Sequence, residues 1–116
     1  MTEHRVHPRF AIRLSAEVAC GDRTFTGTTR NVSVGGCCLE SAFPLAEGAE
    51  VRLDLFVVVD GIEDERMPPL TTRATVQWAA EQDDGAFAAG LRFTGLTAAQ
   101  QRWLDQFLAR TGAGDA

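Results

Sequence analysis

The stretch FAIRLSAEVAC, residues 10–20, alternates apolar and polar side chains over most of its length. Successive side chains of a strand point to opposite faces, so a period of two predicts a strand with one buried face. Gly21 and Asp22, directly after it, indicate a turn. The face that we expect to be buried carries Phe10, Ile12, Leu14, Ala16, Val18 and Cys20.

Shorter stretches of the same kind follow along the chain. About six short strands with regular turns predict a mainly all-β fold, a small antiparallel barrel, because closing a sheet removes its edges. The further strands are expected at 24–30, 37–40, 51–59, 73–78 and 87–93, with turns at 44–48 and 83–85 and an exposed acidic loop at 60–69. The aromatic residues expected in the core or against the helix are Trp78, Phe87, Phe93, Trp103 and Phe107.

The hydrophobic period changes near the C-terminus. Thr97 and Gln100 have the spacing of a helix capping box, and Gly112 is expected to end the helix. We expect this helix to cover the outer face of the 51–59 strand, which is apolar as well. The apolar face of the helix carries Trp103, Leu104, Phe107 and Leu108.

The chain has 116 residues and a formal net charge of −5. This length predicts a single domain at 1–116, with an arm at 1–9, a barrel at 10–96 and a helix at 97–111. No apolar run is long enough to span a bilayer, and the N-terminus lacks the apolar segment of a signal peptide. We therefore expect no membrane insertion and a cytoplasmic location. The acidic balance argues against binding to DNA.

The cysteines and histidines form no recognisable catalytic or metal-binding pattern. Cys20, Cys37 and Cys38 lack C-x-x-C spacing, which favours reduced thiols in a reducing compartment. His4 and His7 form an H-x-x-H pair without further ligands nearby in the sequence. We therefore expect no metal, no cofactor and no catalytic residue.

Arg5 and Arg9 stand four residues apart in the segment RVHPR. In an extended segment, residues i and i+4 point to the same side, and Pro8 favours extended geometry at His7. Two forked guanidinium groups on one side suit phosphate oxygens or the O6/N7 edge of guanine. The alternative is a pair of solvated charges on a loosely ordered chain end.

The segment NVSVGG, residues 31–36, lies between two predicted strands. One interpretation is turn chemistry, in which Asn31 and Ser33 hydrogen-bond nearby backbone and the two glycines permit positive φ. The other is an anion or base site, because glycines let a ligand approach the backbone while Asn31 and Ser33 supply polar groups. Taken alone, the segment leaves both interpretations open.

Together, RxxxR and, one hairpin later, NxSxxG resemble the PilZ domain family, whose hallmark is RxxxR followed by [D/N]xSxxG. The segment GLRF, residues 90–93, is a weaker match to the closing strand of that family. The resemblance extends from about Arg5 to Phe107. It implies a six-stranded antiparallel β-barrel with a C-terminal α-helix, which binds the bacterial second messenger cyclic dimeric GMP (c-di-GMP).

The resemblance also implies roles for the motif residues. Arg5 and Arg9 would clamp a guanine and a phosphate, and Asn31 and Ser33 would contact a base or phosphate from the barrel side. His4 stands where the family often has Arg, a position that bears on whether one or two ligand molecules bind. The implied ligand-binding residues are Arg5, Arg9, Asn31, Ser33 and Gly36 (the close turn), with His4, Gly35, Arg30 and Arg92 as weaker candidates.

The implied function is a stand-alone, non-enzymatic receptor that binds c-di-GMP and signals to an unidentified protein partner, as a monomer or a ligand-linked dimer. An alternative is a PilZ-like adaptor that acts by protein contact without ligand, which the intact motifs argue against. A single-stranded nucleic-acid binder needs a basic groove and exposed aromatics, whereas this chain is acidic and has neither Lys nor Tyr. A hydrolase of cyclic dinucleotides is the least supported alternative.

Overall fold

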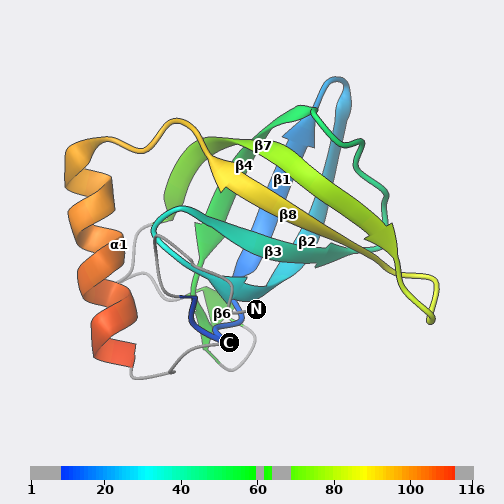
Figure 1. Cartoon of the computed structure of the whole chain (residues 1–116). Coiled ribbons are helices and arrows are strands. Elements are labelled where there is room, and N and C mark those ends of the chain that lie inside the picture. Colours follow the sequence, from blue (N-terminus) through cyan, green and yellow to red (C-terminus); the bar gives the residue numbers. More distant parts are fainter. Residues whose placement is uncertain (1–8, 60–61, 64–68, 112–116) are drawn as a thin grey trace, which may run out of the picture.

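Six antiparallel strands close into a barrel in the order β1-β2-β3-β8-β7-β4 (Figure 1). The computed structural model describes residues 9–59, 62–63 and 69–111. The barrel strands are β1 (Ser15–Cys20), β2 (Arg23–Val32), β3 (Gly36–Ser41), β4 (Glu50–Phe56), β7 (Leu70–Glu81) and β8 (Phe87–Phe93). The other elements are the short pair β5 (Val58–Val59) and β6 (Ile62–Glu63) and the helix α1 (Ala98–Thr111). The predicted barrel with a C-terminal helix is confirmed.

The segment before β1, residues 10–14, is held by the side chain of Thr29 and not by the regular backbone hydrogen bonds of a strand. The predicted strand starts at Phe10, but β1 begins at Ser15. The fully buried Thr29 hydroxyl accepts a hydrogen bond from the Leu14 backbone N–H and donates one to the Ile12 carbonyl, both at 2.7 Å. The backbone of Phe10 forms an isolated antiparallel bridge with Val32. The segment therefore crosses the end of β2 without continuing the sheet.

A β-bulge in β2 changes which side chains face outward. Thr29 pairs with Leu39 in β3, while Asn31 pairs with Cys38, so Arg30 is the extra residue. Thr29 and Val32 are both fully buried although three positions separate them, which strict alternation does not allow. The bulge thus brings Arg30 and Asn31 side by side on the outer face of the barrel, the surface that points away from the core.

A second bulge, in β7, overturns one prediction. Val76 pairs with Leu91, but Trp78 pairs with Gly90, so Gln77 is the extra residue. Leu91 belongs to the core and Gly90 points outward, so the bulge turns Trp78 to the outer face, where it is 40% exposed. The prediction that Trp78 lies in the core or against the helix is wrong, because the period of two breaks at the bulge.

The other predicted aromatic residues lie at or near the core. Phe93 and Phe107 are part of the buried cluster, and Trp103 packs against it. The rings of Trp103 and Phe107 stack with their centroids 5.4 Å apart. Phe87, near the far end of the β7–β8 hairpin, is half-buried.

Helix α1 begins with the predicted capping box. The Thr97 backbone N–H donates to Gln100 Oε1 at 2.9 Å, and the Gln100 N–H donates to Thr97 Oγ1 at 3.1 Å. The predicted end at Gly112 lies outside the described residues. No helix in the described part of the chain has the length and apolarity that crossing a membrane requires.

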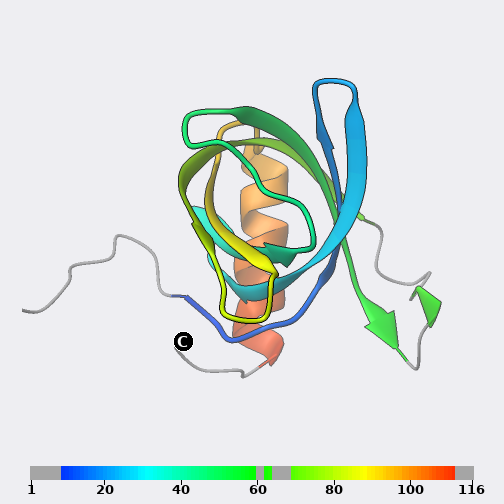
Figure 2. The ribbon, with the colours of Figure 1, turned by 90° about the vertical axis from the view of Figure 1, so that its right-hand side faces the viewer.

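The helix covers one end of the barrel rather than the outer face of β4. Figure 2 shows α1 behind the ring of strands, across its far end. Its buried side chains Leu104, Phe107 and Leu108 belong to the same cluster as the interior of the barrel. The expected position over β4 is wrong, because these side chains reach the core through the open end and close it there.

Candidate ligand-binding face

The chain directly after Arg9 is tied to the end of β2. Phe10 and Val32 exchange backbone hydrogen bonds of 2.8 and 2.9 Å. Burial raises the pKa of Cys37 to about 12 and also raises that of Cys38, and the positive charge of Arg9 acts against both shifts. The Phe10–Val32 bridge therefore places the backbone of Arg9 beside the end of β2.

Asn31 presents an unusual polar atom on this face. Its side chain is half-buried, and its Oδ1 is buried without a hydrogen-bond partner in the described part of the chain. A buried acceptor without a hydrogen-bond partner lowers the free energy of unfolding by about 1–3 kcal/mol. Buried polar groups are normally paired, so this unpaired acceptor calls for a specific explanation.

Ser33, by contrast, is fully engaged in the turn between β2 and β3. Its Oγ accepts hydrogen bonds from the backbone N–H groups of Gly35 and Gly36, both at 3.1 Å. The Ser33 N–H donates to the Gly36 carbonyl at 2.8 Å, and the side chain is only 5% exposed. Of the two interpretations of NVSVGG, turn chemistry therefore describes Ser33, while it does not describe Asn31.

Gly36 is required by the close approach of two strands. A Cβ placed on Gly36 would lie 2.0 Å from the carbonyl oxygen of Leu91 in β8. Positive φ occurs at Gly21, Gly48 and Gly85 and not at Gly35 or Gly36, so this turn does not use the positive φ that its two glycines permit. Glycine is therefore required at position 36 by the neighbouring strand β8, and not by the conformation of the turn.

Arg92 and Gly35 lie at the edge of the same region. Arg92 is exposed and pairs across strands with Gly36 on one side and Thr75 on the other. A hollow of about 540 Å³ separates the β2–β3 turn from the start of α1. Its lining residues are Val34, Gly35, Arg92, Phe93, Thr94, Leu96 and Gln101.

Arg30 points away from this hollow, along the outer face. Its Nη2 lies 2.8 Å from Glu40 Oε2 and 3.4 Å from Gln82 Oε1. Arg13 approaches the other Glu40 oxygen at 3.4 Å. The hydrogen bond from Arg30 lowers the pKa of Glu40, and Glu40 in turn raises the pKa of Arg30. Arg30 is thus already paired with a carboxylate.

The predicted residues therefore divide into four groups. Arg9, Asn31, Gly36 and Arg92 come together around the β2–β3 turn, and Ser33 and Gly35 build that turn. Arg30 is near in space but paired with Glu40. His4 and Arg5 lie outside the described residues. Among the described residues, no three His, Cys, Asp or Glu side chains are grouped so as to hold a metal ion.

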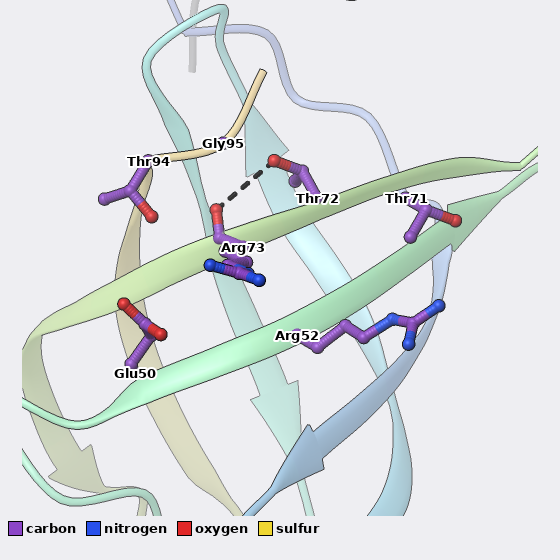
Figure 3. A pocket seen from close by; sticks show the side chains of 7 residues that line it. All are labelled: Glu50, Arg52, Thr71, Thr72, Arg73, Thr94 and Gly95. Atoms are coloured by element: carbon purple, nitrogen blue, oxygen red, sulfur yellow. Dashed lines mark hydrogen bonds between the residues drawn. The ribbon is translucent and has the colours of Figure 1, made fainter. Parts of the chain in front are cut away.

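A second hollow, of about 550 Å³, lies on β4 and β7 and contains none of the predicted ligand residues (Figure 3). Arg52 and Arg73 are direct cross-strand partners there. Figure 3 shows their side chains extending in different directions. Like charges in such a pair repel, and extension into solvent reduces that repulsion. We interpret this surface as solvated. Its remaining lining residues are Glu50, Thr71, Thr72, Thr94 and Gly95.

Solved structures similar to this chain share its barrel. The inhibitor of motility MotI/DgrA from Bacillus subtilis matches with a TM-score of 0.77 at 18% identity, over 95% of this chain and 51% of that chain. The PilZ domain of Escherichia coli YcgR with c-di-GMP matches with a TM-score of 0.73 at 13% identity, over 93% and 91% of the two chains. The K. pneumonia MrkH–c-di-GMP complex matches with a TM-score of 0.73 at 17% identity, over 95% and 52%.

The chain thus spans about half the length of MotI/DgrA and of MrkH and nearly all of the YcgR domain. No curated protein sequence matches it. The sequence model of the PilZ domain matches residues 3–110, which is nearly the whole chain. The chain belongs to the PilZ domain family.

Proposed function

We propose that this PilZ domain is a receptor for c-di-GMP. The observation that carries the proposal is the buried Asn31 Oδ1, which has no partner in the described ranges, next to the Phe10–Val32 bridge that holds the chain directly after Arg9. Two of the similar structures, those of the YcgR domain and of MrkH, contain c-di-GMP. We propose that this chain binds the same ligand.

The chemistry of guanine suits these two groups. Guanine offers an amino donor to the Asn31 oxygen and the O6 and N7 acceptors to a forked guanidinium. Arg9 would bind that acceptor edge or a phosphate of the ligand, and a bidentate bond to either is charge-assisted. The ligand would therefore satisfy a buried acceptor and neutralise a cation at the same time.

We further propose that Arg5 supplies the second guanidinium of the RxxxR pair, with His4 beside it. Arg92 would contribute a cation at the edge of the face, with Gly35 next to it, and Arg30 would contribute only if it left Glu40. Ser33 and Gly36 act as positioning residues, because one holds the turn and the other permits the β3–β8 approach. Whether one or two ligand molecules bind depends on the residues around His4.

In this proposal the domain works by binding and not by catalysis. Ligand would hold the arm, residues 1–9, against the β2–β3 turn and so change the surface that the domain presents. A cytoplasmic protein partner would recognise that surface.

Calorimetric titration with c-di-GMP tests the proposal, with c-di-AMP as the comparison ligand. We expect saturable binding of c-di-GMP, and a loss of about 1.5–3 kcal/mol on Arg5→Ala or Arg9→Ala, the range for a hydrogen bond to a charged group. Arg110→Ala, on the exposed last turn of α1, is the matched control and should bind as the wild type does. No heat of binding from the folded wild-type protein would reject the receptor and favour the ligand-free adaptor.

A further inference from the structure

The loop between β3 and β4, residues 42–49, lies across the end of the barrel opposite α1. Figure 2 shows this loop in front of the ring of strands and α1 behind it. Leu45 is 9% exposed and belongs to the interior cluster, so it fixes the loop to the core. The apolar residues around it, Ala42, Phe43, Pro44 and Ala46, are all exposed. This end of the barrel therefore carries an apolar surface that the core does not use.

Phe43 is held in its exposed position by its neighbours in the chain. Its side chain is 46% exposed. The Ser41 hydroxyl donates a hydrogen bond to the Phe43 carbonyl at 2.7 Å and accepts one from the Phe43 N–H at 3.3 Å. Pro44 further restricts the backbone of the residue before it. A side chain on a backbone that is already ordered loses less entropy when a partner binds it.

Arg23, the first residue of β2, lies over two aromatic rings. The rings of Phe25 and Phe43 have their centroids 5.3 Å apart. The Arg23 guanidinium carbon lies 5.8 Å from the Phe25 centroid and 5.5 Å from the Phe43 centroid. Two cation–π contacts restrict the position of the guanidinium. Within the described ranges, the ion pairs involve Arg13 and Arg30 and leave Arg23 without a carboxylate partner.

A groove of about 340 Å³ lies beside these rings. Arg23 is the only charged residue among the described residues that line it. The other lining residues are Cys20, Phe25, Pro44, Leu45, Ala46 and Ala49. We call this groove, with Arg23 and Phe43 beside it, the β3–β4 groove. Its volume is at the low end of the range of about 300–1,000 Å³ for small-molecule sites, and its lining suits an apolar side chain of a partner.

The β3–β4 groove lies apart from the candidate ligand-binding face. Arg23 and Asn31 stand near opposite ends of β2, a strand of 10 residues that spans roughly 30 Å. Gly36 begins β3, whereas Phe43 follows its end. Among the described residues that line the groove, none is a predicted ligand-binding residue. A protein bound at the groove would therefore leave the ligand-binding face open.

We infer that the β3–β4 groove is a docking site for a protein segment in which a large apolar side chain stands next to a single carboxylate. The apolar side chain would pack against Phe25 and Phe43, and the Arg23 guanidinium would donate to the carboxylate. Asp22 and Glu47 are exposed and flank the groove in the sequence, so a longer acidic stretch would be repelled. The site is complete without ligand, so docking is constitutive and the inference does not depend on the proposed function.

A peptide-display selection tests the chemistry of the partner. A random library of short peptides is selected in parallel on the immobilised wild-type protein and on Phe43→Ala. Peptides that are enriched on the wild type alone should combine an aromatic or branched aliphatic residue with one Asp or Glu close to it. Enrichment of basic peptides, or the same peptides on both proteins, would overturn the proposal.

Titration of the most enriched peptide, made with a fluorescent label, measures the contribution of each side chain. Arg23→Gln should weaken binding about tenfold or more, as expected for the loss of a hydrogen bond between charged groups. Arg102→Gln, on the exposed surface of α1, is the matched control and should bind as the wild type does. Equal affinities of Arg23→Gln and Arg102→Gln would contradict the role of Arg23. If Phe43→Ala does not fold, Arg23→Gln takes its place in the selection, because Arg23 is exposed and its substitution leaves the core intact.

Two further measurements separate this docking site from its alternatives. Saturating c-di-GMP should leave the affinity for the peptide unchanged, and a change would overturn constitutive docking. Sedimentation velocity should show a monomer, whereas a wild-type dimer that Phe43→Ala abolishes would make a second copy of the chain the occupant and overturn the protein partner. Failure of the wild type to bind c-di-GMP would reject the receptor function alone, because the peptide titration is done without ligand.

Discussion

Phe10 and Val32 exchange a pair of backbone hydrogen bonds, of 2.8 and 2.9 Å, although Phe10 belongs to no strand. This bridge joins the chain directly after Arg9 to the residue directly after Asn31. Two motif residues that are far apart in the sequence thereby meet at one end of β2. The hydroxyl of Thr29 supports the same segment through its bonds to Ile12 and Leu14.

Thr29→Val should destabilise the protein by about 2 kcal/mol or more. Valine fills the same space but leaves the Leu14 N–H and the Ile12 carbonyl without their hydroxyl partner at a buried site, and each unsatisfied group costs about 1–3 kcal/mol. Urea unfolding measures the difference, and Thr26→Val, on the exposed face of the same strand, is the control. Equal stability of the two variants would contradict the role of Thr29. Because Arg9 directly precedes the same segment, ligand affinity should fall as well.

Asn31→Ala should separate binding from stability. The substitution removes a buried oxygen that has no partner among the described residues, so the free energy of unfolding should stay unchanged or rise by up to about 1 kcal/mol. The affinity for c-di-GMP should fall about tenfold or more, because the base loses its acceptor. Parallel unfolding and calorimetry on the same preparation check this prediction. A large loss of stability would instead mean that Asn31 is a structural residue.

Glu40→Gln should reduce stability at neutral pH by about 0.2–1 kcal/mol, a small amount because the ion pair is partly exposed. The hydrogen bond from Arg30 lowers the folded-state pKa of Glu40 below its ordinary value of 4.5. Its contribution is therefore full above that ordinary value and is lost as the pH falls through the folded value.

Urea unfolding of the wild type and Glu40→Gln at pH 7 and at progressively lower pH tests this sign, since the difference should shrink as the pH falls through the folded-state pKa of Glu40. Glu47→Gln, on the exposed turn before β4, is the control. A difference that persists in acid would show that charge is not its cause. If Arg30 contributes to ligand binding, Glu40→Gln should also raise the affinity for c-di-GMP, because Arg30 is released.

Gly36→Ala should destabilise the protein much more than Gly90→Ala. Both glycines lie in the β3–β8 pair, and each leaves too little room for a Cβ. At Gly36 the obstacle is the backbone carbonyl of Leu91, which cannot move without separating the strands. At Gly90 it is the indole of Trp78, which can rotate into solvent. Thermal unfolding should therefore show a larger drop for Gly36→Ala, and an equal drop would contradict this reading of the two contacts.

Much of the fold was predictable because its signals are local. The alternation in residues 10–20 requires only that successive strand side chains point in opposite directions. The capping box at Thr97 and Gln100 involves side chains and backbone groups three residues apart, and both of its hydrogen bonds are present. The two motifs identified the family, because their residue types and spacing can be read without knowing the tertiary contacts.

The candidate site was predictable only in part. The sequence named Arg9, Asn31 and Arg92, and the barrel brings them to one region, but the turn bonds of Ser33 and the pairing of Arg30 with Glu40 depend on neighbours in the folded chain. Trp78 was assigned to the core because a strict period of two puts it on the same face as Val76. The glycine at position 90 was the one signal that could have raised doubt, since glycine in a strand often marks a close approach.

The sequence by itself therefore determined the class of fold, the helix start and the family. The tertiary structure alone decided where the bulges at Arg30 and Gln77 fall, and so which of Asn31 and Trp78 face outward. A bulge exists only relative to the register of a partner strand, and Trp78 finds its partner in Gly90 across a hairpin. The position of α1 was decided in the same way, because the open end of the barrel exists only after all six strands have closed.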